Sequence, residues 1–574
     1  MTQRTGRSAL AAIGMTMAMA LSISGTSLAQ EATPDLTSDI TAYPNYGGEV
    51  DCEAGTFNGL PYTGNLKSME APDPQTVVFN FCNPNVAFLA QIAFSALGID
   101  DADYLIAHMA DGSILTAPNG TGPYKMEAWD RGNRMVMTAF EDYWNADRMA
   151  RTPNFELRWS DESAARLNEL LSGTVDGIDN PGRDDMSTIE AEPGLTLYPR
   201  EGTNTFYLGM NNTYEPWNDV RVRQAIAKGI DRQRIVDNFY PPGSEVADFF
   251  TPCSFEAACG GEPWWEFDPE GAKALLAEAG YPDGFQTKLQ LRAAVRGYLP
   301  DPPVIAQEIQ AQLKTNLNID AEIDLQESGT FLDANDAGQL DGLYLLGWGA
   351  DFPDTSNFMD YHFGPGTGQK FGEPIPELVD AIRAGGQTSD LTAREAAYAT
   401  ANDLIRANVP ADIIAHGGSA AAFKSDVDGA HSSPLTSEIF SVMQAGDRDT
   451  LVFMQNAEPL SVYCGDETDG ESLRACEQIK ESLYGYEIGG ATPEPGLAKE
   501  CTPNEDLTVW TCTLNEGITF HDGATLDASD VIVSFAAQWD IASPQHVGRT
   551  GDFAYWSSLI GQGYLNVPPA EPAS

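Results

Sequence analysis

Residues 205–232 read TFYLGMNNTYEPWNDVRVRQAIAKGIDR, and the fold prediction starts from this stretch. The run from Thr205 to Met210 is almost entirely apolar or small, which predicts a buried strand. From Val220 to Ile230, apolar residues recur at helical spacing while Arg, Gln and Lys fall on the other side, which predicts an amphipathic helix. A strand followed by a helix after a short turn is the unit of α/β layers.

The same alternation continues in both directions along the chain. Asp268-Pro269 opens a helix that Gly280 closes, because Pro suits the first helical turn and Gly suits the position just after the last one. Further helices are predicted over 88–94, 160–171 and 303–317, and strands over 76–81, 319–323 and 341–348. Helices and strands thus alternate, and we predict an α/β fold.

The composition excludes some classes of protein. The 574 residues contain 84 Asp and Glu against 32 Lys and Arg, a formal net charge of −52. A protein that binds nucleic acid through phosphate contacts needs a basic face, so that class is excluded and no nucleic-acid partner is expected. Hydrophobic residues make up 42% of the chain, enough for several cores, and at about 150 residues per domain the length suggests three or four domains.

The N-terminus predicts export. Arg4 and Arg7 precede an uncharged run that ends in small residues near Ala29, as in a cleavable signal peptide. No later segment has about 18 consecutive apolar residues, so we expect no membrane span. The first cysteine is Cys52, too far from the apolar run for a lipid anchor, and we expect a free periplasmic protein. The polar, turn-rich stretch from residue 30 to 60 reads as a linker.

Eight cysteines in an exported chain predict disulfides. Pairing nearest neighbours gives Cys253–Cys259, Cys464–Cys476, Cys501–Cys512 and Cys52–Cys82. The third pair, Cys501–Cys512, has the best local support. A turn follows Cys501, and the returning strand brings Cys512 back to it. Metal binding is the alternative, but no pair has the C-x-x-C spacing of a zinc site, so we expect no metal.

Catalytic signatures are missing from the sequence. It contains no H-E-x-x-H, no G-x-S-x-G and no G-x-x-x-x-G-K-[ST] motif, which argues against three common enzyme classes. His416-Gly-Gly-Ser419 reads as a turn. The acidic Asp466-Glu-Thr-Asp-Gly470 has the look of a calcium loop, but the other ligand positions do not match when Gly470 is aligned with the loop glycine. We therefore predict that the protein is not an enzyme.

Several blocks together resemble one family. They are Asn119-Gly-Thr-Gly-Pro-Tyr-Lys125, Phe206-Tyr-Leu-Gly-Met-Asn211, Asp219-Val-Arg-Val-Arg-Gln-Ala-Ile226 and Leu346-Gly-Trp-Gly-Ala-Asp351-Phe-Pro-Asp354. On these motifs the chain resembles the family 5 extracellular solute-binding proteins of ABC importers, the oligopeptide, dipeptide and nickel group. The likeness covers nearly everything outside residues 1–55 and about the last 20.

The order of the blocks differs from that of the family. Elements that normally open the family chain stand last here, namely Leu451–Asn456, Pro495–Ala498, Glu516–Gly523 and Ala528–Phe535. The sequence therefore resembles a circular permutation, with the old ends joined near Ala445 to Leu451 and new ends cut between about Gly561 and Leu60. Such a cut is tolerable because domain ends lie at the surface and close together. A mis-assembled gene model is the alternative.

The resemblance implies a two-lobed α/β fold of the class II periplasmic binding type, with an extra domain on one lobe. The resemblance implies that this chain divides into eight segments. They are 1–29 signal peptide, 30–48 linker, 49–115 extra domain (second part), 116–220 lobe I, 221–429 lobe II, 430–482 lobe I (crossing strands and former N-terminal strand), 483–565 extra domain (first part) and 566–574 tail. We also expect the strand around Val452 to share a sheet with the strand around Tyr207.

The resemblance also implies which residues contact ligand. In peptide-binding relatives an Asp in the loop of the W-G-A-D block pairs with the peptide ammonium, a position that falls to Asp351, with Asp354 as competitor. Both residues would alternatively cap the following turn. The other expected contacts are Trp348, Gly349, Tyr207, Asn456, Glu458 and Arg296, with Arg292 as an alternative carboxylate-holding Arg.

The resemblance implies a periplasmic receptor that closes its lobes on a peptide or similar small solute and delivers it to an ABC permease. We expect a monomer without a cofactor. A nickel chelate, haem, an opine or an oligosaccharide is the alternative ligand, because the same scaffold hosts them. A secreted hydrolase and a surface adhesion module are the remaining alternatives from other functional classes.

Overall fold

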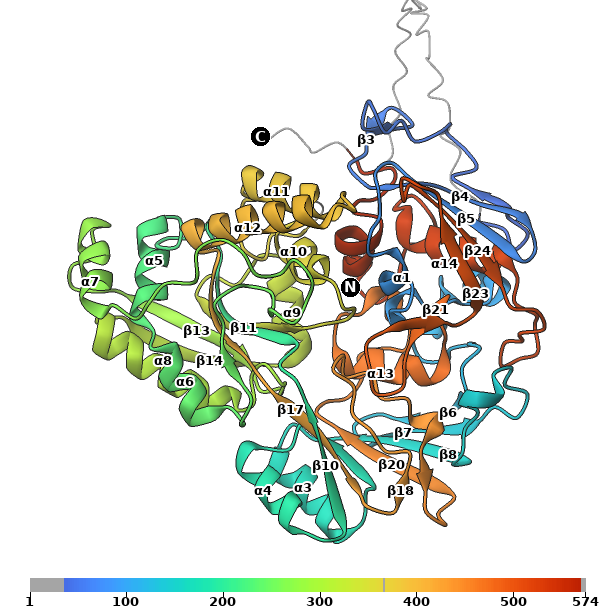
Figure 1. Ribbon diagram of the computed structural model, residues 1–574, viewed down its shortest axis with the longest axis horizontal. Coiled ribbons are helices and arrows are strands. Elements are labelled where there is room, and N and C mark those ends of the chain that lie inside the picture. The colour runs from blue at the N-terminus through green and yellow to red at the C-terminus, as the bar shows by residue number, and fades with distance from the viewer. Residues whose placement is uncertain (1–35, 365–366, 569–574) are drawn as a thin grey trace, which may run out of the picture. The chain divides into compact units, whose positions relative to one another are not determined.

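The computed structural model describes residues 36–364 and 367–568, and the predicted signal peptide lies outside them. Three larger sheets organise the chain (Figure 1). The seven-stranded sheet contains, in order, β10 (Leu195–Arg200), β17 (Ser419–Lys424), β9 (Gly177–Asp179), β20 (Thr450–Gln455), β8 (Asn154–Trp159), β7 (Arg134–Ala139) and β6 (Tyr124–Asp130). The six-stranded sheet contains β12 (Glu245–Val246), β16 (Ala411–His416), β11 (Asn204–Met210), β15 (Leu343–Gly349), β13 (Gln286–Arg292) and β14 (Asp320–Gln326).

The chain crosses between these two sheets twice. It leaves β10 at Arg200 and enters β11 at Asn204, and it returns from β16 at His416 to β17 at Ser419. Each sheet with its helices forms one lobe, so the fold is the predicted two-lobed α/β architecture. The crossings lie earlier than the predicted boundaries at residues 220 and 429. The motif His416-Gly-Gly-Ser419, read as a plain turn from the sequence, is the second crossing.

The expectation that Val452 and Tyr207 share a sheet is wrong. Val452 lies in β20, in the middle of the seven-stranded sheet, whereas Tyr207 lies in β11 of the other sheet. Of the two strands beside the first crossing, β10 lies in the sheet of β20 and β11 does not. A buried apolar run predicts a strand but carries no information about which of two sheets the strand joins.

The predicted helices of the second lobe are confirmed to within a few residues. The helices that surround the six-stranded sheet in Figure 1 are α5 (Val220–Gly229), α6 (Arg232–Phe239), α7 (Pro269–Glu278), α8 (Pro302–Leu317), α9 (Ser328–Asp336), α10 (Thr355–Phe363), α11 (Pro376–Gly386) and α12 (Leu391–Asn408). Asp268 caps α7 by accepting from Gly271 N, and Pro269 follows it at the first position.

The first lobe and the extra domain hold the other α-helices of the described residues. They are α1 (Phe88–Gln91), α2 (Ala102–His108), α3 (Ser163–Ser172), α4 (Arg183–Ala191), α13 (Gly470–Ile479) and α14 (Ala528–Trp539). The helix predicted over 160–171 is α3, which ends as expected at Gly173 in a left-handed conformation with φ of 80°. The helix predicted over 88–94 is shorter, because α1 ends at Gln91 and a 3₁₀ turn follows at Ser95–Leu97.

Both ends of the described chain build the extra domain. Its five-stranded sheet has the order β1 (Ala42–Tyr43), β4 (Leu66–Asp73), β5 (Thr76–Phe81), β24 (Val509–Leu514) and β23 (Ala498–Pro503). Residues 76–81 therefore pair with a strand more than 400 residues away in the sequence. The helix α14, from near the C-terminus, contacts β1, β4 and β5.

The linker prediction for residues 30–48 is wrong for the part that the structure describes. Leu36, Ile40 and Tyr43 are buried, with 3%, 5% and 0% of their surfaces exposed. The hydroxyl of Tyr43 donates to Asp540 Oδ2 at 2.6 Å, so the segment is anchored to the end of α14. The turn-rich composition describes the bends correctly, but it does not show that the few apolar side chains between them enter a core.

All four predicted disulfides are confirmed. They join Cys52 to Cys82, Cys253 to Cys259, Cys464 to Cys476 and Cys501 to Cys512. Cys501 and Cys512 are direct partners in the antiparallel pair of β23 and β24, as expected for a bridge across a hairpin. Three of the four bridges close sequence separations of 6 to 12 residues. Nearest-neighbour pairing succeeds because each of these bridges joins two residues that are close together in the chain.

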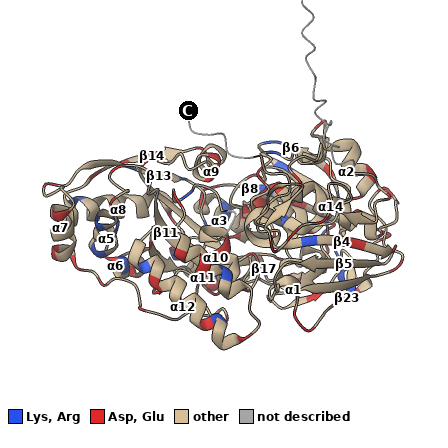
Figure 2. Cartoon of the chain, turned by 90° about the horizontal axis from the view of Figure 1, so that it is seen from above, with Lys and Arg blue, Asp and Glu red and all other residues tan. Residues whose placement is uncertain are grey.

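The acidic excess is distributed over helices and strands of both lobes (Figure 2). Mutual repulsion between such charges keeps molecules apart in solution and is screened by salt. Within the described part of the chain, none of the helices is both long enough and apolar enough to cross a membrane.

Candidate functional site

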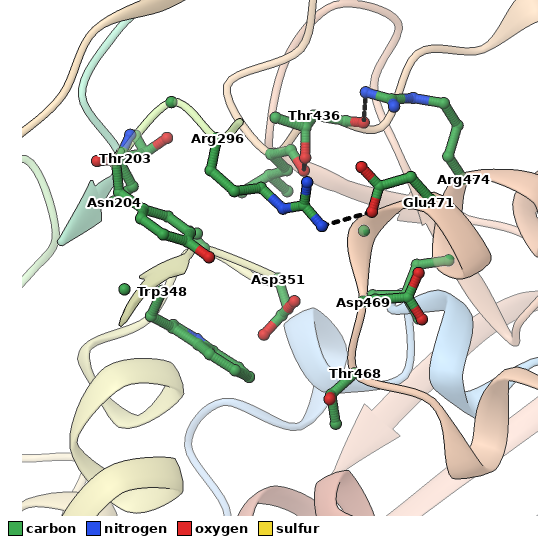
Figure 3. A pocket seen from close by; sticks show the side chains of 18 of the residues that line it. Thr203, Asn204, Arg296, Trp348, Asp351, Thr436, Thr468, Asp469, Glu471 and Arg474 are labelled. Carbon is green, nitrogen blue, oxygen red and sulfur yellow. Dashed lines mark hydrogen bonds and ion pairs between the residues drawn. The ribbon is translucent and has the colours of Figure 1, made fainter. Parts of the chain in front are cut away.

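A cavity lies between the two lobes, beside both crossings (Figure 3). It encloses about 130 Å³ that the centre of a water molecule can reach. One wall comes from lobe II, namely β11, the loop after β13, the end of β15 and α9. The other comes from the ends of β9 and β20, the loop 434–437 and the segment leading into α13. The residues that line the cavity include Asp179, Tyr207, Arg292, Arg296, Asn335, Trp348, Gly349, Asp351, Asn456, Asp469, Glu471, Arg474, Glu477 and Tyr555.

An aromatic stack forms the floor of the cavity. The ring of Trp348 lies 3.7 Å from that of Tyr361, stacked at 24°, and 5.8 Å from that of Tyr555 on the other side of the cavity. The indole Nε1 donates to Asn357 Oδ1 at 3.0 Å, which fixes the ring. Gly349 ends β15 beside it, and a Cβ at that position would meet no atom within 4 Å. The end of β15 thus offers an apolar face with open space in front.

Asp351 follows this strand and is held by neutral donors. Its Oδ2 accepts from Asn357 Nδ2 at 3.0 Å, and its Oδ1 accepts from Tyr555 OH at 3.0 Å. Burial raises the pKa of Asp351 to about 7, although the hydrogen bonds from Asn357 and Tyr555 lower it. Because Tyr555 comes from the other side of the cavity, the Asp351 carboxylate lies where the two sides meet.

Two predicted contacts are not brought into the cavity. Asp354 caps α10, accepting from Ser356 N at 2.9 Å, and forms an ion pair of 2.6 Å with the buried Arg394. This is the capping role considered as the alternative in the sequence analysis. Glu458 accepts from Trp129 Nε1 and Gly132 N, both at 3.0 Å, on the side of the first lobe. Both carboxylates have structural partners outside the cavity, and neither is among the residues that line it.

The two candidate arginines differ in their partners. Arg296 lines the cavity, but its guanidinium makes an ion pair of 2.6 Å with Glu471 of α13, across the gap between the lobes (Figure 3). Arg292 donates to Ser328 Oγ at 2.9 Å and to Tyr298 OH at 3.4 Å. No ion pair among the described residues involves Arg292. Of the two, Arg292 has the guanidinium that still lacks an anion.

Tyr207 and Asn456 lie on opposite walls. Tyr207 is 1% exposed, and its ring packs edge-on against His362 at 5.6 Å. Asn456 follows β20, and its Nδ2 donates to Asp179 Oδ2 at 3.1 Å. Six of the eight predicted contacts therefore line the cavity: Tyr207, Arg296, Trp348, Gly349, Asp351 and Asn456.

Sequence reasoning missed a buried ion network at the hinge side of the cavity. Arg474 pairs with Asp179 at 3.0 Å and with Glu438 at 3.2 Å, and Arg200 pairs with Asp179 at 2.7 Å and with Glu438. Burial raises the pKa of Asp179, but attraction from Arg474 and Arg200 outweighs it and holds the pKa below its usual value. These residues are spread over residues 179–474, so no local motif marks them.

The described residues contain no cluster of three or more His, Cys, Asp or Glu side chains placed to hold a metal ion. The cavity wall, as the structure describes it, contains no histidine. Its polar groups are carboxylates, amides, hydroxyls and guanidiniums, which hold a ligand through hydrogen bonds and charge.

Comparison with known proteins places this geometry in context. The family described as "Bacterial extracellular solute-binding proteins, family 5 Middle" matches residues 32–370 and 492–556, more than half of the chain. The dipeptide-binding protein of Escherichia coli (strain K12) is 26% identical over 389 residues, 66% of this chain and 71% of the relative. Heme-binding protein A of Haemophilus influenzae is 27% identical over 308 residues, 53% of this chain and 55% of the relative.

A solved structure shares the fold. The dipeptide binding protein from Pseudoalteromonas sp. SM9913, in complex with Met-Leu, superposes with a TM-score of 0.58 at 25% identity. The superposition covers 62% of this chain and 71% of that chain.

Proposed function

Because this chain belongs to the bacterial extracellular solute-binding proteins, family 5, we propose that it is a periplasmic receptor that captures a peptide between its lobes. It then delivers the peptide, without chemical change, to an ABC permease in the membrane. The export signal predicted near Ala29 and the peptide-binding relatives support this role. The receptor acts as a monomer, without cofactor or nucleic acid.

The observation that carries the proposal is the environment of Asp351. A carboxylate buried without a cation is costly, and Asp351 has only neutral hydrogen-bond donors, which leaves its pKa at about 7. An ammonium group entering the cavity supplies the missing positive charge. A peptide with a free amino terminus carries such a group, and the ring of Trp348, which is backed by Tyr361, offers an apolar surface for its backbone or first side chain.

The opposite end of a peptide needs a positive partner. Arg292 is the better candidate than Arg296, because Glu471 already neutralises Arg296. A guanidinium matches a carboxylate in planar, two-pronged geometry. Asp351 and Arg292 both belong to lobe II, so a bound peptide rests first on that lobe. Contacts from Asn456 and Tyr555 then favour the closed state, which is the condition for ligand-driven closure.

The function is tested with the purified mature protein. Native mass spectrometry of untreated protein is expected to show a mass increment that disappears on unfolding and refolding, and fragmentation identifies the increment as a peptide. Calorimetry of the stripped protein with a panel of di- and tripeptides is expected to show saturable binding. A co-purified nickel chelate, haem, opine or sugar, together with no binding of any peptide, contradicts the proposal.

We also propose that the chain is a circular permutation of the usual family order. Two contacts bring the proposed new ends together: Asn65 N donates to Gly561 O at 2.7 Å, and Asn566 Nδ2 donates to Tyr46 OH at 2.6 Å. The proposed junction is the turn 446–449 between β19 (Gln444–Ala445) and β20, which lies at the surface. Both observations fit a chain whose usual ends are joined at this turn and whose new ends lie next to each other in the extra domain.

A recut chain tests the permutation. A variant that begins at Asp447, ends at Gly446 and joins residue 568 to residue 36 through a flexible linker is expected to fold with an unchanged far-ultraviolet circular dichroism spectrum. Its thermal midpoint should lie within a few degrees of the parent, because a new cut in a surface turn breaks few contacts. Failure to fold, while a control cut in another surface turn such as 131–132 is tolerated, contradicts the proposal.

A further inference from the structure

The wall of the cavity is strongly acidic. The lining residues carry seven carboxylates and three guanidiniums, with no lysine or histidine among those that the structure describes. The carboxylates belong to Asp179, Glu201, Asp336, Asp351, Asp469, Glu471 and Glu477. A zwitterionic dipeptide brings one positive and one negative group, so its binding leaves this excess of negative charge unchanged.

Protein partners already engage most of the positive charge. Arg296 is paired with Glu471, and Arg474 is shared between Asp179 and Glu438. Of the three arginines that line the cavity, only Arg292 has no acidic partner among the described ion pairs. The cavity therefore has one guanidinium for a ligand anion, and more than one acidic group without a cation.

The unpartnered polar atoms of the wall are all acceptors. Among the described lining residues, three buried side-chain atoms have no hydrogen-bond partner: Asn335 Oδ1, Asn456 Oδ1 and Asp469 Oδ2. The amide orientations follow from their neighbours, because Asn456 Nδ2 donates to Asp179 Oδ2 at 3.1 Å and Asn335 Nδ2 donates to Asp336 Oδ1 at 3.2 Å. No unpartnered donor of this kind occurs on the described wall. A ligand rich in N–H donors fits these atoms.

Asp469 is the charged member of the three. It is 5% exposed and caps α13, where its Oδ1 accepts from Ser472 N at 2.9 Å while Oδ2 has no partner. None of the described ion pairs involves Asp469, although its neighbours Glu467 and Glu471 each have an arginine. It belongs to the acidic run Asp466-Glu-Thr-Asp-Gly470, which looks like a calcium loop in sequence but contributes to no metal-binding cluster among the described residues.

We propose that the cavity selects ligands with a second cationic group, an ammonium or guanidinium, whose partner is Asp469 on lobe I. This deepens the proposed function and rests on it, because it assigns the peptide class as one with a Lys or Arg side chain. Figure 3 shows Asp351 and Asp469 on different elements around the same opening, with Thr468 beside Asp469. The ligand's amino terminus binds Asp351 on lobe II and its basic side chain binds Asp469 on lobe I. A doubly cationic ligand thereby connects the lobes.

The test compares ligands that differ only in charge. Calorimetry measures the affinities of Ala-Arg and Ala-citrulline, whose side chains have nearly the same shape while only the first is cationic. Ala-Arg is expected to bind at least about ten-fold more tightly than Ala-citrulline, because a hydrogen bond to a charged group usually changes affinity by that factor or more. The Asp469→Asn variant is expected to bring this ratio close to one. Asn retains the cap of α13, because its side-chain oxygen still accepts from Ser472 N.

A matched control separates a specific contact from a general field. Glu270→Gln removes the same formal charge from the exposed face of α7, where the side chain is 85% exposed, and is expected to leave the ratio at its parent value. Equal affinities of the parent protein for Ala-Arg and Ala-citrulline overturn the inference while the peptide function stands. So does an unchanged ratio in Asp469→Asn.

The two proposals fail in different ways. If no dipeptide binds but agmatine, a small dication without a carboxylate, binds the parent protein and loses affinity in Asp469→Asn, the charge inference stands and the peptide function falls. If neither the dipeptides nor agmatine bind, both are overturned.

Discussion

Replacing Asp351 with Asn is expected to weaken the binding of a neutral dipeptide by roughly 30-fold or more, the cost of removing one partner of a buried charge pair. The change conserves side-chain volume. The Tyr555 hydroxyl, which donates to Asp351 Oδ1, accepts equally well from an amide, so the local packing has a hydrogen-bonded alternative. Isothermal titration calorimetry measures the change, and the thermal midpoint checks that the fold is intact.

The pH dependence of binding gives the same prediction a second readout. With a pKa of about 7, Asp351 is increasingly protonated below pH 7 in the free protein, and a protonated carboxyl attracts an ammonium weakly. Affinity is therefore expected to fall by about ten-fold per pH unit below pH 7. The Asp351→Asn variant should lose this dependence, because it has no proton to release at that site.

The control for Asp351 is Asp354, the other carboxylate that the motif offers. Asp354 binds Arg394 and the first turn of α10 outside the cavity. Asp354→Asn is expected to lower the thermal midpoint while Asp351→Asn is expected to lower the affinity. An Asp351→Asn protein that binds dipeptide as tightly as the parent at pH 7.5 contradicts the assignment of the ammonium partner.

Removing Arg474 is expected to destabilise the first lobe by about 3–5 kcal/mol, the usual cost of breaking a buried ion pair. Arg474→Met keeps a long apolar stem but leaves Asp179 and Glu438 with only Arg200 as a cation. The network therefore retains two buried carboxylates with a single guanidinium. Urea denaturation followed by circular dichroism measures the loss as a lower midpoint.

An exposed ion pair supplies the matched control. Arg151 pairs with Asp428 at 2.6 Å, with side chains 44% and 74% exposed. Arg151→Met is expected to cost under about 1 kcal/mol, because water screens the pair and already solvates both charges. If Arg474→Met is no less stable than Arg151→Met, the network does not stabilise the hinge side of the cavity. The same urea denaturation is measured for the parent, for both variants and for Arg474→Lys, which keeps the positive charge at this position.

Three of the six predicted residues that line the cavity were predictable because they lie in one continuous motif that resembles a block of the family. Trp348, Gly349 and Asp351 occur within four positions at the end of a buried strand, and the cavity forms where that strand ends. Asp354 shares the motif but faces the next helix, a difference of direction that spacing does not reveal. The acidic run around Asp469 was visible in the sequence, but its calcium-like appearance hid the cavity-lining role of a single carboxylate.

The sequence by itself determined the α/β class, the helices α3, α5, α7 and α8 and the four disulfides, because these features follow from residues near one another in the chain. Only the tertiary structure decided which sheet received β11, that Leu36, Ile40 and Tyr43 are buried, and that Glu471 rather than a ligand faces Arg296. Those outcomes depend on contacts between residues tens to hundreds of positions apart. The free energy of such contacts comes from burial and charge pairing in three dimensions, which local periodicity does not encode.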